Sequence, residues 1–222
     1  MLTYQRRSFD DIITIKVGPA AKEFKLHEGL LCDASSYFTA ALRGKFIESH
    51  DRCVVLPEDD ANVFEHFQFW IYTGNLLETS EPPIKISWEI LIGLYHFGDA
   101  RDIPALQNAA IDLIIDKEHA SNHLSPPWLR QIYQMPKKSP LRRLLADFMA
   151  HLAKLDAEPW ISENMKASYP REFLLDLTAA LYELSSGQRK RIKSFKAIRS
   201  EYHVEVTPSS AKGAEAASHP SR

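Results

Sequence analysis

The sequence has few of the features that mark secreted or membrane-spanning proteins. Among its 222 residues are two cysteines, Cys32 and Cys53, too few for the disulfide framework of a small secreted domain. Both have apolar neighbours, as expected of buried thiols in a reducing compartment. No apolar run reaches the roughly 20 residues that span a bilayer, and the N-terminal residues include no apolar signal-peptide core. These absences predict a soluble, intracellular protein with no membrane partner.

Glycine-rich loops and a strong charge of one sign are also absent. The eight glycines are scattered and form no GxxxxGK[ST], GxGxxG or GxSxG pattern. A net charge of −2 argues against nucleic-acid binding by the chain as a whole. No two side chains are placed as base and nucleophile. The sequence therefore predicts no catalytic residue and no cofactor, and it favours an interaction protein over an enzyme.

The first half of the chain begins with the pattern of a β-hairpin. Hydrophobic residues make up 45% of the sequence, enough for a core. Residues 13–17 and 23–27 alternate between apolar and polar, as half-buried strands do. Gly18-Pro19 supplies turn residues between them. Residues 53–56 form a further short apolar strand, which Pro57 stops.

Between and after these strands the period changes to that of helices. Apolar residues recur every three or four positions from Leu30 to Leu42, and Ser35-Ser36 indicates a break with a new N-cap. Asp59 or Asp60 begins a helix with a broad apolar stripe, which Gly74 ends. That stripe is formed by Val63, Phe67, Trp70 and Ile71.

The second half shows helical patterns and no strand pattern. Helices are predicted after Ser87, at Pro104, around Trp128, after Ser139-Pro140, around Trp160 and after Pro170. Gly98-Asp99 is expected to end or bend the first of them. The last carries an apolar face of Phe173, Leu174, Leu177, Leu181 and Leu184.

Six short patterns occur in order along the first half. They are Asp11-Ile12; Phe24…His27…Leu31; Ser36-Tyr37-Phe38; Phe46-x-Glu48-Ser49; Val55-x-Pro57; and Phe64…Phe67…Trp70-x-Tyr72-x-Gly74. Together they resemble the BTB/POZ domain, in the variety common in fungal proteins. The resemblance implies an α+β fold, a small β-sheet flanked by a cluster of α-helices, over residues 9–116. An all-helical extension over 117–186 and a basic, largely disordered tail over 187–222 are expected to follow.

The resemblance also implies a site of contact with a protein partner. In BTB domains that act as adaptors, a hydrophobic-x-Glu motif docks onto a cullin scaffold, and Phe46, Ile47, Glu48 and Ser49 occupy that place here. An apolar anchor beside one charge suits a protein interface. The alternative is that Phe46 folds back onto the domain and Glu48 caps the next turn.

The sequence departs from the family pattern at three places. About ten residues precede Asp11, which puts the strand-exchanged type of BTB dimer in doubt. In members with a charged pocket, the early aspartate pairs with a basic residue just after the histidine. That place is Glu28 here, so Asp11 and Glu28 are not expected to form such a pocket. No Kelch repeat, MATH domain or zinc finger follows, so the helical half or the tail would have to recruit a target.

Other clusters that suggest chemistry have simpler explanations. His119 and His123 have helical spacing but no CxxC or HExxH beside them, so no metal site is predicted.

Residues 58–60 are acidic, and a helix cap explains them better than a Mg²⁺ site. Cys32 and His27 suggest a nucleophile pair, but apolar surroundings raise the pKa of a thiol and would leave Cys32 unreactive. The aromatic cluster Phe64, Phe67, Phe69 and Trp70 lacks interleaved basic residues and indicates core rather than a base-stacking platform.

Residues 188–199 include six basic side chains, for which three interpretations stay open. They form a solvated face or linker, a nuclear localisation signal, or a phosphate-binding patch. The leading functional hypothesis is a cytoplasmic or nuclear adaptor that bridges targets to a cullin-RING ubiquitin ligase complex. The alternatives are a scaffold for homotypic or heterotypic oligomerisation and a nuclear, DNA-associated regulator that works through the basic tail.

Overall fold

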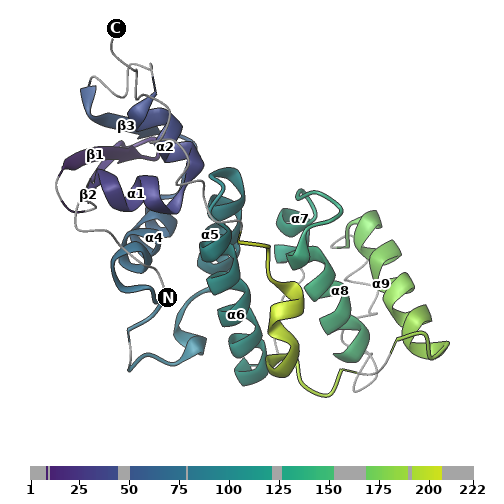
Figure 1. Ribbon diagram of the computed structural model, residues 1–222. Helices are drawn as coiled ribbons and strands as arrows, with labels where there is room; N and C mark the ends of the chain where they lie inside the picture. Colours follow the sequence, from purple (N-terminus) through teal and green to yellow (C-terminus); the bar gives the residue numbers. More distant parts are fainter. Residues whose placement is uncertain are drawn as a thin grey trace, which may run out of the picture. The chain divides into compact units, whose positions relative to one another are not determined.

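The computed structural model describes residues 9, 11–44, 51–78, 80–121, 127–152, 169–189 and 192–206 (Figure 1). The chain divides into two compact units. Unit 1 comprises residues 1–75, 97–106 and 205–222, and unit 2 comprises 76–96 and 107–204. The segments predicted from the sequence, 9–116, 117–186 and 187–222, rest on the family resemblance, the helical pattern and a shift in composition, and they stay a prediction.

Unit 1 contains a three-stranded sheet in the order β2-β1-β3. Strand β1 (Ile12–Val17) pairs antiparallel with β2 (Lys22–His27) and parallel with β3 (Cys53–Leu56). Gly18 begins the hairpin turn at φ +75°, and a Cβ there would lie 3.2 Å from the carbonyl oxygen of Asp59. The predicted hairpin and third strand are thus confirmed, and glycine is required at the turn.

The helices of unit 1 begin and end at the residues that the sequence indicates. Helix α1 (Glu28–Ala34) gives way to α2 (Ser36–Arg43) at Ser35, whose hydroxyl accepts the amide N–H of Phe38 at 3.2 Å. Helix α4 (Ala61–Thr73) begins at Asp60, whose carboxylate accepts two backbone N–H groups at 2.7 and 3.1 Å. Gly74 ends it in the left-handed conformation, at φ +74°.

An aromatic cluster centred on α4 forms the core of unit 1. The ring of Phe64 lies 4.8 Å from that of Phe24 on β2, measured between centroids. Phe67 lies 6.3 Å from Phe38 on α2 and 4.8 Å from Phe97. Phe64, Phe67 and Trp70 are buried, and Phe69 is half-buried. The predicted core role of this cluster is confirmed for the three buried residues.

Unit 2 is helical over the residues that the structure describes. It contains η2 (Pro83–Lys85), most of α5 (Trp88–Ala100) and most of α6 (Pro104–Ser121). It continues with α7 (Pro127–Ile132), α8 (Pro140–Leu152), α9 (Arg171–Ser185) and η4 (Lys196–Tyr202). The α+β fold with a helical continuation is therefore confirmed.

Three helix expectations have different outcomes. Helix α5 runs through Gly98 and Asp99 to Ala100, because one glycine weakens a packed helix without ending it. On α9, Phe173 and Ala180 are buried but Leu174 is 45% exposed, so the predicted face was too wide. Successive helical residues point about 100° apart, which turns Leu174 away from the side that Phe173 buries. The helix predicted around Trp160 lies outside the described residues.

Within the described ranges, no helix is both long and apolar enough to cross a membrane. The longest, α6, has 18 residues and includes Asp112, Asp116 and Lys117.

Two isoleucines on β1 provide a matched test of the core. Ile15 is fully buried, whereas Ile12 on the same strand is 56% exposed. We expect Ile15→Ala to lower the free energy of unfolding by about 2–5 kcal/mol, because it leaves a cavity among packed side chains. Ile12→Ala should cost at most about 1 kcal/mol. Urea denaturation of the two variants measures both, and equal losses would contradict this placement of the strand.

Candidate protein-interaction site

The predicted docking residues Phe46, Ile47, Glu48 and Ser49 lie outside the described residues. The structure does describe both flanks of this segment. On one side α2 ends at Arg43, followed by Gly44. On the other side, Arg52 directly precedes β3. The side chains that hold these two flanks therefore set where the docking segment begins and ends.

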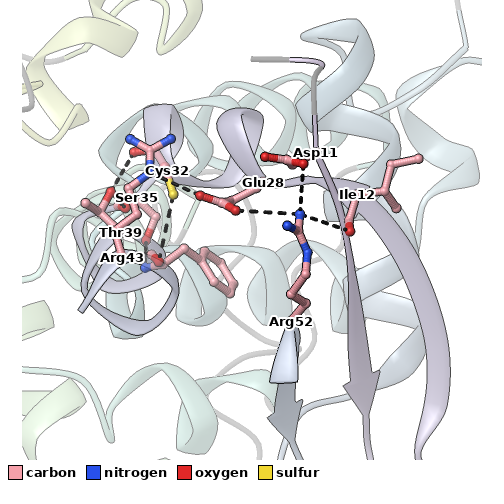
Figure 2. A network of polar contacts seen from close by, with 9 residues as sticks. Asp11, Ile12, Glu28, Cys32, Ser35, Thr39, Arg43 and Arg52 are labelled. Atoms are coloured by element: carbon pink, nitrogen blue, oxygen red, sulfur yellow. Dashed lines mark hydrogen bonds and ion pairs between the residues drawn. The ribbon is translucent and has the colours of Figure 1, made fainter. Parts of the chain in front are cut away.

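A charged network connects the two flanks through Glu28, the first residue of α1 (Figure 2). Arg43 Nε lies 3.2 Å from Glu28 Oε1. Arg52 Nη2 lies 3.9 Å from Glu28 Oε2 and 3.3 Å from Asp11 Oδ1. One glutamate thus contacts the arginine that precedes the docking segment and the arginine that follows it.

Both the backbone and the side chain of Arg52 form hydrogen bonds with strand β1. Its carbonyl oxygen accepts the amide N–H of Thr14 on β1 at 3.1 Å. Its guanidinium donates to the carbonyl oxygen of Ile12 at 3.5 Å, a long contact. The residue adopts φ +49°, a left-handed conformation that is unfavourable for any residue with a Cβ. Arg52 therefore enters β3 through a strained turn.

Arg52 is the site residue that sequence reasoning missed. The sequence predicts that Asp11 and Glu28 do not form a charged pocket, because a glutamate cannot supply the positive charge that such a pocket needs. A cation nevertheless reaches Asp11, because strand pairing brings Arg52 beside it from 41 positions away in the sequence. Asp11 and Arg52 are 63% and 47% exposed, so this ion pair contributes about 0–1 kcal/mol to stability. Only the pairing of β3 with β1 reveals the contact.

Cys32 and His27 do not form a nucleophile pair. The Cys32 thiol is buried and lies 4.0 Å from the carbonyl oxygen of Phe38. His27 Nδ1 instead lies 2.8 Å from the hydroxyl of Tyr72 on α4. Burial raises the pKa of the Cys32 thiol, as the apolar surroundings predict.

The acidic residues 58–60 include the predicted helix cap and one further contact. Asp60 caps α4, which confirms the simpler interpretation. Asp59 forms an ion pair with Arg101, and only 18% and 11% of their side chains are exposed. The Arg101 guanidinium also lies 4.2 Å from the ring centroid of Phe97. Asp59 thus joins the loop before α4 to the turn after α5, a contact that the sequence does not reveal.

The described ranges contain no group of three or more His, Cys, Asp or Glu side chains arranged to hold a metal ion. His119 lies in the last turn of α6, and His123 falls outside the described residues.

The described part of the basic run differs from a purely solvated face. Arg189 pairs with Asp147 on α8, and its Nη2 lies 2.6 Å from Asp147 Oδ2. Lys196 and Arg199 each lie 3.2 Å from Asp116 Oδ1 on α6. Arg189 and Arg199 are half-buried against acidic residues of unit 2, whereas Lys196 stays exposed, as the solvated-face interpretation predicts.

A three-stranded sheet packed against helices, followed by further helices, defines an α+β domain. Residues 3–111 match the family model of the BTB/POZ domain. The chain therefore belongs to the BTB/POZ domain-containing proteins, and its first half is a protein–protein interaction module. Comparison with curated proteins gives no match.

Replacing Arg52 with alanine or with glycine removes the same ion pairs but has different effects on the backbone. Glycine adopts positive φ without the Cβ penalty, so Arg52→Gly should be more stable than Arg52→Ala by about 0.5–1 kcal/mol. Chemical denaturation of both variants measures the difference. A more stable alanine variant would contradict the left-handed conformation at this position.

Thiol reactivity tests the burial of Cys32. Because its pKa is raised, Cys32 carries less thiolate near pH 8 and should react slowly with Ellman's reagent in the folded protein. Cys53 is half-buried and should react first. In Cys53→Ser, the remaining thiol should react much faster in denaturant than in buffer. Equal rates in the two solvents would contradict the burial.

Proposed function

We propose that this chain is an adaptor that links a target protein to a cullin-RING ubiquitin ligase. The BTB/POZ module supports the proposal, since its work is contact with proteins. The observation that carries it is the Phe46-x-Glu48 pattern in a segment whose flanking residues, Arg43 and Arg52, both contact Glu28. With this function the chain works in the cytoplasm, the nucleus or both, and needs no cofactor.

The flanking contacts support docking for a physical reason. A short segment pays less conformational entropy on binding when its two ends are already held by the folded domain. Phe46 would supply the apolar anchor and Glu48 the adjacent charge that fixes the register. Ile47 and Ser49 would complete the contact.

A binding measurement with purified cullin scaffold tests the docking residues. Phe46→Ala/Glu48→Lys should weaken binding at least about tenfold, because it removes the anchor and reverses the charge. The control is Ile84→Ala/Glu81→Lys, which makes the same kinds of change at two exposed positions of the same module. The control should bind like the wild type.

Two results of this experiment would contradict the proposal. Equal affinity of the docking variant and the wild type would remove Phe46 and Glu48 from the interface. Failure of the wild-type chain itself to bind cullin would remove the ligase role.

A second candidate function is an assembly scaffold that acts through self-association. It is supported by Ile12 and Val55, both 56% exposed, on the face of the sheet opposite the core. Sedimentation across a range of concentrations distinguishes the two functions. A scaffold shows a mass that rises with concentration and no affinity for cullin.

A further inference from the structure

The segment 192–204, called the strap here, lies along helices α6 and α8 within unit 2 (Figure 1, yellow-green). Its regular structure is the 3₁₀ helix η4. Of its side chains only Tyr202 is buried, and the others are half-buried or exposed. The strap is therefore a surface segment held by the helices beneath it.

The helices hold the strap partly by its backbone. The side-chain amide of Asn108 on α6 accepts the N–H of Val204 at 2.7 Å and donates to the carbonyl oxygen of the same residue at 2.9 Å. On α8, Nε2 of His151 accepts the N–H of Ile192 at 2.9 Å. Hydrogen bonds of this kind hold a backbone whatever its side chains are, as main-chain contacts do in peptide recognition.

Two aromatic side chains anchor the strap on α8. The Tyr202 hydroxyl donates to Asp147 Oδ2 at 2.7 Å, and Arg143 lies 4.9 Å from the Tyr202 ring. The ring of Phe195 lies 4.3 Å from that of Phe148, between centroids. The side chain of Asp147 is 98% buried and also forms an ion pair with Arg189. The segment that follows α9 therefore balances the buried negative charge.

Charge complementarity extends the contact to α6. Arg199 lies 3.2 Å from Asp116 and 3.7 Å from Asp112, and His203 Nε2 lies 2.9 Å from Asp112. On α6 the helix side thus offers carboxylates opposite Arg199 and His203, whereas on α8 the cation Arg143 faces the strap. Such pairs favour a basic partner over an acidic one.

We propose that this face of α6 and α8 is a peptide-binding site that the chain fills with its own strap. When the strap is displaced, the face takes a basic, aromatic segment of a partner protein with the same chemistry. Asn108 and His151 bind the backbone of that segment, Asp147 and Phe148 bind its aromatic residues, and Asp112 and Asp116 bind its cations. The site supplies a target-recruiting surface and does not depend on docking by Phe46–Ser49.

A labelled synthetic peptide of residues 187–206 serves as the probe. In the intact chain the strap competes with it, because both require the same face. The full-length variant Phe195→Ala/Tyr202→Ala weakens the strap but leaves the helix side unchanged. It should bind the peptide at least about tenfold tighter than the wild-type chain. Fluorescence anisotropy measures both affinities.

Two controls separate peptide recognition from simple charge attraction. Adding Asn108→Ala to the strap-weakened variant removes the two hydrogen bonds that this side chain makes with the peptide backbone and should lower affinity about tenfold. A peptide of the same composition in scrambled order should bind at least about tenfold more weakly.

Three outcomes would overturn the proposal. The peptide could bind the wild-type and strap-weakened chains equally, or the scrambled peptide could bind as well as the native one. Loss of cooperative unfolding in the strap-weakened variant would make the segment part of the core rather than a displaceable ligand.

Discussion

The packing of α4 against its neighbours is the interaction on which unit 1 depends. Phe64 and Phe67 on this helix contact rings from β2, α2 and the end of α5, so one helix joins the sheet to α2 and to the end of α5. Strands of four to six residues have little stability of their own, and burial of their apolar side against α4 supplies what is missing. The register of the sheet follows, because a shift by one residue would expose Ile13, Ile15 and Val17.

The apolar core leaves the polar residues to specific contacts. Around Glu28, two arginines hold the flanks of the predicted docking segment. In unit 2, the buried carboxylate of Asp147 gathers Arg189 and Tyr202 from the last part of the described chain. Burying a charge costs free energy unless the charge has such partners. Asp147 therefore binds the segment that contains Arg189 and Tyr202 specifically.

Local features of the fold could be predicted from the sequence because their causes are local. Ser35, Asp60 and Gly74 begin or end helices by bonding to residues within four positions, and the alternating pattern of β1 depends only on its own side chains. Arg52 and Arg101 behave differently. Their partners Asp11 and Asp59 are 41 and 42 positions away, and no spacing rule connects them. The strap was missed for the same reason, since its composition suggests solvation while the acidic residues opposite it belong to α6 and α8.

The central claim is that α4 and the sheet share one core and form one cooperative unit. Hydrogen exchange followed by mass spectrometry tests this most directly, because amides in one cooperative unit are exposed by the same unfolding event. The account predicts that the slowest amides of residues 13–17 and of residues 64–71 have the same free energy of opening after correction for their intrinsic exchange rates, and that Ile15→Ala lowers both by the same amount. Rapid exchange of the strands while α4 stays protected would contradict it.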